Sequence, residues 1–451
     1  MPAPSHTGVH GQIPPGPPRL PVLGNLLQLS GRNSLQSFLD LRAAYGDIVA
    51  LKIGPRSLYL VADPESVHRV LVKNQKNYVK GAGYRSLRLL VGHGLLTSDG
   101  ELWRQQRRLM QPSFTPAATG RFLEMMVEVT QGLIQRWQPA AEQGHALNMD
   151  AEMMRLTMSV IGRAMFGVDL STELAEVGRA FHGVFNAITN RTLAIRLPLG
   201  GNRRFERDMA TIERFVADKI AEGRAKPDSG TMLSVLLRSR DEESNTGMSE
   251  AQLRDEVVTL FFAGFETTAR SLTWAWYVVS RHPRVRARLE QEADQVLGGR
   301  APGLDDLHNL SYTRMVVDET LRLYPPTAVL PRDPVADDEL AGYRIPAGSM
   351  VLLLPFAVHR NPALWPEPDL FQPERFTPEA EADRPKYAYI PFASGPRVCL
   401  GNSFALLEMV LALAIVSARY RVEHLSAEEI AIGYQGTIKP SRPLMVRLER
   451  R

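Results

Sequence analysis

Residues 392–401 read Phe-Ala-Ser-Gly-Pro-Arg-Val-Cys-Leu-Gly and contain Cys399, the only cysteine among 451 residues. A single cysteine excludes an internal disulfide and any zinc or iron–sulfur cluster held by several thiolates. Gly395 and Gly401 let the backbone approach a large flat group closely. Arg397 brings a positive charge near the sulfur, and the helix expected after the loop points its positive end at Cys399. These features favour a thiolate, whereas a lone cysteine is usually a small buried apolar residue.

A thiolate with no histidine nearby in the sequence suits a metal ligand better than a nucleophile. One thiolate bond to a planar iron cofactor then indicates haem. The ten residues match the pattern Phe-x-x-Gly-x-Arg-x-Cys-x-Gly and resemble the cysteine loop of the cytochrome P450 family, the haem-thiolate monooxygenases. The resemblance implies haem b, iron protoporphyrin IX, with Cys399 as the iron ligand and Phe392 and Arg397 beside the cofactor.

A long helix is predicted from Ser249 to His282. Ser249-x-x-Gln252 fits a capping box, and Pro283 ends the helical pattern. At 1.5 Å per residue this helix is about 50 Å long. It is apolar nearly all round over two stretches, which predicts a central and buried position.

Inside that helix, residues 263–268 read Ala-Gly-Phe-Glu-Thr-Thr and place an acid where burial is costly. On their own they predict a kinked helix with a surface glutamate. They resemble the acid–alcohol motif of the cytochrome P450 family, which implies that Glu266 and Thr267 pass protons to dioxygen so that its O–O bond breaks. We expect Gly264 to let the helix widen at this point.

The segment Glu319-Thr-Leu-Arg322 places an acid and a base on one face of a helix, a pattern that is most often a solvated surface pair. The segment Pro373-Glu-Arg-Phe follows downstream, in the order found in the family. The resemblance implies a buried network of Glu319, Arg322 and Arg375 that supports the haem pocket. Such a network must be fully paired, so the loss of one member should cost several kcal/mol and haem retention.

The segment Trp103-Arg-Gln-Gln-Arg107 places an indole N–H and a guanidinium group one helical turn apart, where both can reach the same carboxylate. Taken alone, it indicates a basic amphipathic helix on a solvated face. The resemblance implies that Trp103 and Arg107, together with Arg397 and Arg332, bind the haem propionates. Neighbouring arginines of this helix are expected to help dock an electron donor.

Composition is that of an ordinary globular protein, with 44% hydrophobic and 23% charged residues. A net charge of +4 is mild for this length, and the sequence has no dense basic stripe, so we expect no nucleic-acid partner. No apolar stretch approaches the roughly 18–20 residues of a membrane span, and the polar start does not resemble a signal peptide. We therefore expect a cytoplasmic protein with no membrane anchor, and the expected oligomeric state is a monomer.

The predicted fold is mostly α with small β-sheets, in which the long central helix lies over a buried haem as in the cytochrome P450 fold. Strands are predicted at 47–53 and 56–61, and helices dominate from 66 to 323. We divide the chain into a Pro-rich segment, 1–21, and a single catalytic domain, 22–451. Because no flavin or iron–sulfur module is evident, electrons from NAD(P)H should arrive through a separate ferredoxin or flavodoxin with its reductase.

The substrate pocket is predicted from position within the family, including the region around 181–205, and its segments are mostly apolar. The residues predicted to contact substrate are Leu95, Phe262, Ala263, Val329, Leu330 and Ile438. The predicted activity inserts one oxygen atom from O2 into a C–H or C=C bond of a hydrophobic small molecule, a terpenoid or a fatty-acyl compound. The alternatives are a peroxide-driven or isomerising haem-thiolate enzyme, and a non-catalytic haem sensor or electron carrier.

Overall fold

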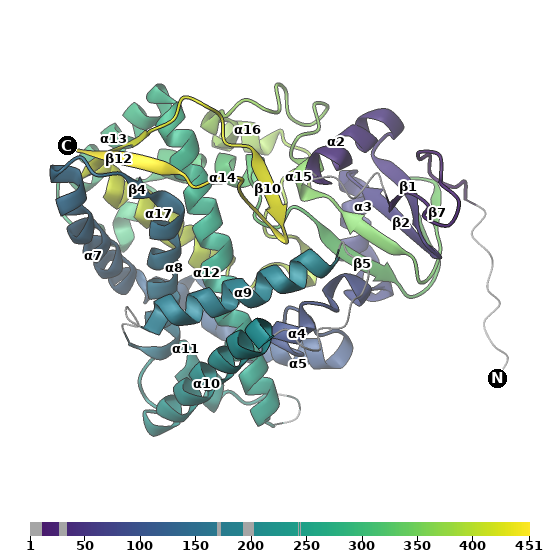
Figure 1. Cartoon of the computed structure of the whole chain (residues 1–451), viewed down its shortest axis with the longest axis horizontal. Coiled ribbons are helices and arrows are strands. Elements are labelled where there is room, and N and C mark those ends of the chain that lie inside the picture. Colours follow the sequence, from purple (N-terminus) through teal and green to yellow (C-terminus); the bar gives the residue numbers. More distant parts are fainter. Residues whose placement is uncertain (1–10, 27–33, 169–172, 193–202, 242, 244) are drawn as a thin grey trace. The chain divides into compact units, whose positions relative to one another are not determined.

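The computed structural model of the chain is shown in Figure 1, and its described residues form two compact units. The described residues are 11–26, 34–168, 173–192, 203–241, 243 and 245–451. Unit 1 comprises 1–85, 327–369 and 384–399, and unit 2 comprises 86–326, 370–383 and 400–451. Residues 1–10 of the predicted Pro-rich segment lie outside the described residues, and the predicted division at residue 21 stays a prediction.

Unit 1 is built on a five-stranded sheet with the order β1-β2-β8-β5-β3. The hairpin β1–β2 is antiparallel, β2 and β8 run parallel, and β8 and β5 run antiparallel. Asp63 begins the helix after β2, because its carboxylate accepts the backbone N–H of Ser66 at 2.7 Å. The elements of unit 1 are α2 (Ser34–Tyr45), β1 (Ile48–Ile53), β2 (Arg56–Val61), α3 (Pro64–His68), β3 (Tyr78–Val79), β5 (Leu330–Pro334), β6 (Asp338–Leu340), β7 (Tyr343–Ile345), β8 (Met350–Leu353) and α15 (Pro355–Val358), with short helical turns at Arg69–Lys73, Gln75–Asn77, Gly81–Tyr84 and Gly395–Arg397.

Unit 2 is helical, with two small sheets in the strand orders β4-β12-β9 and β10-β11. Its helices are α4 (Arg88–Val91), α5 (Gly100–Met110), α6 (Pro116–Gly120), α7 (Leu123–Glu142), α8 (Met149–Phe166), α9 (Glu173–Thr192), α10 (Arg203–Ala225), α11 (Met232–Arg238), α12 (Glu250–Arg281), α13 (Pro283–Leu297), α14 (Ser311–Leu323), α16 (Pro378–Ala382) and α17 (Asn402–Ser417). Its strands are β4 (Leu147–Asn148), β9 (Tyr420–His424), β10 (Ile432–Gln435), β11 (Thr437–Pro440) and β12 (Met445–Arg450), and short 3₁₀ turns lie at Gln111–Phe114, Leu304–His308 and Pro373–Phe376.

The central helix of unit 2 is α12, which packs against α8, α10, α14 and α17 (Figure 1). Its capping box is formed as predicted. The Ser249 hydroxyl accepts the N–H of Gln252 at 3.2 Å, and the Ser249 N–H donates to the Gln252 side chain at 2.8 Å. Most of its residues are buried, because apolar side chains surround the helix on nearly all sides.

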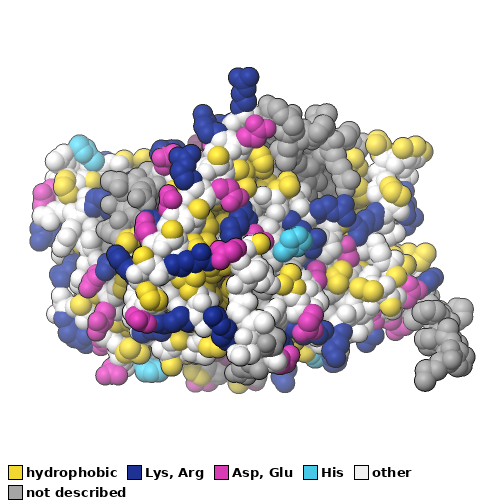
Figure 2. Space-filling model, turned by 90° about the horizontal axis from the view of Figure 1, so that it is seen from below, with side chains coloured by type: hydrophobic (Ala, Val, Ile, Leu, Met, Phe, Trp, Pro, Cys, Tyr) yellow, Lys and Arg dark blue, Asp and Glu magenta, His cyan; other side chains and the backbone are white. Residues whose placement is uncertain are grey.

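The predicted fold class is confirmed: the chain is mostly helical with small sheets. Among the described residues, no helix combines the length and the apolar character needed to cross a membrane. On the face shown in Figure 2, Lys and Arg side chains are interspersed with Asp and Glu side chains, so the charge of that face is mixed in sign.

Candidate functional site

The cysteine loop of unit 1 is a tight turn held by its own backbone. The N–H of Cys399 donates to the carbonyl of Phe392 at 2.9 Å, and the N–H of Val398 donates to that of Gly395 at 3.0 Å. Gly395 has a φ of +70°, and a Cβ there would lie 2.3 Å from the carbonyl oxygen of Leu71. Only glycine fits this position. The loop therefore presents Cys399 with its side chain exposed in unit 1.

Two arginines of unit 1 belong to the predicted cofactor set. Arg332 lies in β5 and is 4% exposed. Its Nη1 donates to the carbonyl of Pro331 at 2.7 Å, with the Tyr84 hydroxyl at 3.4 Å. Arg397 is half-buried within the short turn after Gly395.

In unit 2, α5 carries Trp103 and Arg107 one helical turn apart, and both side chains are half-buried. Residues four apart lie on the same helix face. This placement is compatible with one carboxylate accepting from both side chains, and their binding of a haem propionate stays a prediction.

One stripe of α12 remains partly open although the helix around it is buried. Ala263, Gly264 and Thr267 are half-buried, whereas Phe265 and Glu266 between them are buried. Ala263 and Thr267 are four residues apart and therefore lie on one face of the helix, which forms the open stripe. The hydroxyl of Thr267 donates to the carbonyl of Ala263 at 2.8 Å.

The expected widening of α12 at Gly264 is absent, because the helix is α-helical without interruption from 250 to 281. The glycine has a different physical reason. A Cβ at Gly264 would lie 2.8 Å from both Cγ1 and Cδ1 of Ile161 on α8. Gly264 therefore allows α8 to approach α12 closely.

Glu266 is buried, with 2% of its surface exposed. Its Oε1 accepts from Arg270 Nε at 3.0 Å and from the Thr437 hydroxyl at 3.3 Å. The surface glutamate of the alternative interpretation is therefore not what the structure shows. The charge of this acid is compensated one turn along its own helix.

Arg270 extends this cluster to two other helices, through partners that the sequence did not predict. Its Nη1 donates to Asp150 on α8 at 2.5 Å, and its Nη2 lies 2.9 Å from Nε2 of His182 on α9. Burial alone would lower the pKa of Arg270, but the carboxylates of Glu266 and Asp150 outweigh this and raise it. The four-residue spacing of Glu266 and Arg270 on one helix could have predicted their ion pair from the sequence. Asp150 and His182 are distant in sequence and gave no such signal.

The predicted triad of charged residues comes together inside unit 2. Glu319 and Arg322 on α14 are both fully buried, and Glu319 accepts from Arg322 Nε at 2.6 Å and from its Nη2 at 2.8 Å. Arg375 Nε lies 3.5 Å from the same carboxylate, which also accepts the backbone N–H of Gln372 at 2.8 Å. Burial raises the pKa of the Glu319 carboxyl, and the hydrogen bonds from Arg322 oppose that increase. The network fastens the segment around 370–376 to α14.

Comparison with known proteins identifies the family of this chain. The family model described as Cytochrome P450 matches residues 14–448. This chain belongs to the cytochrome P450 family. A solved structure described as the heme domain of cytochrome P450DA aligns with a TM-score of 0.89 at 29% identity, covering 98% of each chain.

Two similar curated proteins are P450s of Streptomyces melanosporofaciens. Cyclooctatin synthase is 37% identical, with 92% of this chain and 91% of that protein covered. Cyclooctat-9-en-7-ol 5-monooxygenase is 36% identical, with 90% and 88% covered. Pentalenene oxygenase of Streptomyces avermitilis is 32% identical, with 99% and 98% covered. The chain is thus an enzyme of the P450 monooxygenase family.

The donor groups of this P450 fit a haem. Cys399 offers one exposed thiol, which suits a cofactor that brings its other iron ligands with it. Trp103, Arg107 and Arg397 are half-buried N–H donors of the kind that bind carboxylates. The open stripe of α12 consists of small side chains, which a flat group can approach.

The predicted substrate residues differ in how much surface they retain. Leu95, Ala263 and Val329 are half-buried, whereas Phe262 and Leu330 are buried at 6% and 7% exposure. Ile438 has no exposed surface. Of the predicted region 181–205, residues 193–202 lie outside the described residues.

Phe262 belongs to a cluster of phenylalanine rings within unit 2. The ring of Phe185 lies 4.9 Å from that of Phe262, and the ring of Phe181 lies 6.0 Å from it, centroid to centroid. These contacts join α9 to α12 through aromatic side chains. Phe181 has no exposed surface, and Phe262 and Phe185 are 6% and 8% exposed, so this is a buried aromatic cluster next to Ala263 in the chain.

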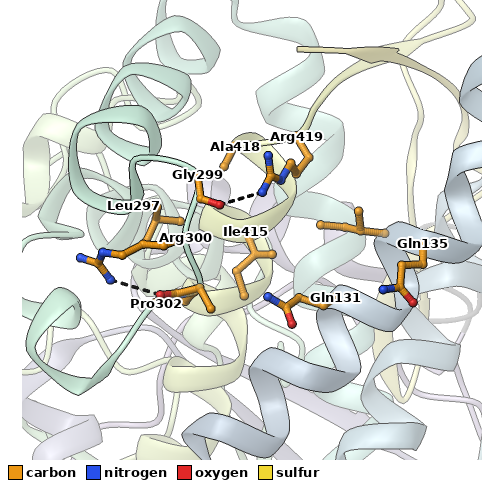
Figure 3. A pocket seen from close by; sticks show the side chains of 11 residues that line it. Gln131, Gln135, Leu297, Gly299, Arg300, Pro302, Ile415, Ala418 and Arg419 are labelled. Atoms are coloured by element: carbon orange, nitrogen blue, oxygen red, sulfur yellow. Dashed lines mark hydrogen bonds between the residues drawn. The ribbon is translucent and has the colours of Figure 1, made fainter.

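A pocket of about 300 Å³ lies elsewhere in unit 2 (Figure 3). It is lined from α7, the end of α13 and the end of α17, and Arg419 in its wall donates to the carbonyl of Gly299 at 2.8 Å. It contains none of the residues predicted to contact substrate or haem.

Proposed function

We propose that this P450 is a haem-thiolate monooxygenase that inserts one oxygen atom from O2 into a C–H or C=C bond of a terpenoid. The observation that carries the proposal is the pairing of a buried, ion-paired Glu266 with a half-buried Thr267 on one turn of α12. When bound, the haem supplies the iron at which dioxygen is activated.

Cys399 is the proposed iron ligand. The tight turn that Gly395 permits fixes the backbone around the sulfur, and Arg397 adds positive charge that favours the thiolate. Trp103, Arg107, Arg332 and Arg397 are proposed to bind the haem propionates. Phe392 is proposed to lie beside the cofactor.

Glu266 and Thr267 are proposed to supply the protons that dioxygen needs. The Thr267 hydroxyl is held by the carbonyl of Ala263, so one of its lone pairs can accept a hydrogen bond from water. Glu266 is anchored through Oε1, which leaves Oε2 as the oxygen that can take up and release a proton.

A terpenoid substrate is favoured over a fatty-acyl compound by the relatives. Three of them are named for cyclooctatin, cyclooctat-9-en-7-ol and pentalenene, which are terpenoid compounds. The buried aromatic cluster of Phe181, Phe185 and Phe262 makes the surroundings of Ala263 apolar, which supports an apolar substrate. A spin-state titration of the holoenzyme against terpenes, fatty acids and steroids tests this choice, and a shift only with fatty acids would contradict it.

P450 monooxygenases generally receive electrons from partner proteins. We propose a ferredoxin or flavodoxin with its reductase as the route from NAD(P)H. The cytoplasmic location and the monomeric state expected from the sequence stay predictions.

The role of Thr267 is tested with Thr267→Ala. This variant should keep the spectrum of the reduced, carbon-monoxide-bound enzyme while electrons are diverted to hydrogen peroxide, because the proton supply is impaired. Thr130→Ala is the matched control, since the Thr130 hydroxyl makes the same bond to the carbonyl of Met126 at 2.8 Å in α7. An unchanged yield of product per NAD(P)H in Thr267→Ala would refute the assigned role.

A further inference from the structure

The second carboxyl oxygen of Glu266 is buried, and among the described residues it accepts no hydrogen bond. Nδ1 of His182 lies 3.7 Å from Oε2 of Glu266. An unsatisfied buried acceptor is costly, so its presence at a functional carboxylate calls for a physical reason. His182 on α9 faces that oxygen.

Arg270 determines which nitrogen of His182 carries the proton. Its Nη2 lies 2.9 Å from Nε2 of His182. A guanidinium group only donates hydrogen bonds, so Nε2 must accept. The proton of the neutral ring is therefore on Nδ1, the atom that faces Glu266.

The surroundings keep this ring neutral. Burial lowers the pKa of His182, and the positive charges of Arg270 and Lys439 act in the same direction. The carboxylates of Glu266 and Asp150 act in the opposite direction and do not outweigh burial. Around His182, the charged groups thus come from α12 (Glu266 and Arg270), α8 (Asp150) and β11 (Lys439).

His182 also reaches the surface of its unit, which Glu266 does not. The side chain of His182 is 36% exposed, and that of Glu266 is 3% exposed. We propose that His182 is the relay residue through which solvent protons reach Glu266, an inference that rests on the proposed role of Glu266.

Each passage of the relay moves one proton, so the two protons that one turnover of a monooxygenase consumes need two passages. A solvent proton binds Nε2 of His182 when the Arg270 N–H moves away, and the proton on Nδ1 then passes to Oε2 of Glu266 as the two atoms approach. One proton enters the ring and one leaves it, so His182 ends neutral and Glu266 becomes a neutral acid. Proton exchange with water restores the starting tautomer.

His182→Asn separates relay from positioning. The amide nitrogen of asparagine is bonded to Cγ, as Nδ1 is in histidine, so the variant can donate to Glu266 but cannot accept a proton at one atom and release another. His424→Asn is the control, because His424 is half-buried in β9 beside the ring of Tyr277 and its pKa is also lowered by burial. Glu266→Gln tests the underlying function.

Two measurements on the holoenzyme are needed. The first is product and hydrogen peroxide per NAD(P)H, in H2O and D2O, with the terpene that gives the largest spin-state change and a ferredoxin with its reductase. His182→Asn should reduce coupled product at least about tenfold, which is less than the roughly 100-fold or more lost with a general acid–base group because water can replace part of the path. Its solvent isotope effect should also rise, since proton supply becomes limiting.

The second measurement is ¹⁵N NMR of histidine-labelled, carbon-monoxide-bound enzyme, which should show the Nδ1–H tautomer for His182.

The outcomes distinguish the relay through His182 from the proton-supplying role of Glu266. If Glu266→Gln uncouples the enzyme and His182→Asn does not, the relay is wrong and the proposed function stands. If neither variant uncouples it, the proton-supplying role of Glu266 is wrong. Should His182→Asn fail to fold, the NMR measurement on the unmodified enzyme decides, because an Nε2–H tautomer or a doubly protonated ring at neutral pH would overturn the relay.

Discussion

Replacing Glu319 by glutamine is the most direct test of the buried charge network. Glu319→Gln keeps the shape of the side chain and removes the one negative charge that faces both Arg322 and Arg375. Glu319 and Arg322 have no exposed surface, so water cannot solvate the positive charge of Arg322 once the charge of Glu319 is removed. Breaking a fully buried ion pair from one side costs about 3–5 kcal/mol. That loss is a large part of the roughly 5–15 kcal/mol by which a protein is stable.

The matched control lies in the segment that also carries Arg375. Glu374 pairs with Arg288, but both side chains are 53% exposed. Glu374→Gln should therefore change the free energy of unfolding by no more than about 1 kcal/mol. Urea unfolding followed by far-UV circular dichroism gives both values, with haem content measured on the same samples. The reasoning is refuted if the two variants are equally stable, or if Glu319→Gln stays within about 1 kcal/mol of the unmodified protein.

Two further predictions concern packing and pH. Gly264→Ala should destabilise the protein by about 1–2 kcal/mol, because the new Cβ meets Ile161 while the gain in helix propensity offsets part of the cost. In urea unfolding, the double variant Gly264→Ala, Ile161→Ala should lose less free energy of unfolding than the two single variants lose together. Strict additivity of the two losses would contradict the proposed contact. Hydrogen bonds from Arg300 and from the N–H of Gly303 lower the pKa of Asp306 to about 2. The pKa of Asp306 is lower in the folded state than in the unfolded state. Asp306 therefore adds about 1–2 kcal/mol to the free energy of unfolding above pH 4, and this contribution is lost as the pH falls towards 2. The stability difference between the unmodified protein and Asp306→Asn should therefore shrink between pH 6 and pH 3, and a constant difference would argue against it.

The sequence predicted the parts of the fold that depend on local patterns. The capping box at Ser249 and the stop at Pro283 defined α12 closely, because both signals act within one turn of the helix. The association of Glu319, Arg322 and Arg375 followed from the family resemblance, since residue 375 is distant in sequence from the other two. The predicted role of Gly264, a widening of the helix, was wrong. The glycine instead allows the close approach of Ile161, which depends on how two helices pack.

The cluster around Arg270 shows the same limit. Its ion pair with Glu266 is a contact between residues four apart, which sequence reasoning can find. Its contacts with Asp150 and His182 arise only when α8 and α9 pack beside α12. The tautomer of His182 follows from those contacts and has no signal in the sequence.

The central claim is that Cys399 binds the iron of a haem as a thiolate. The absorption spectrum of the reduced, carbon-monoxide-bound protein tests this claim most directly. Thiolate ligation by Cys399 should give a red-shifted Soret band. A Soret band of the histidine-ligated type would contradict the claim.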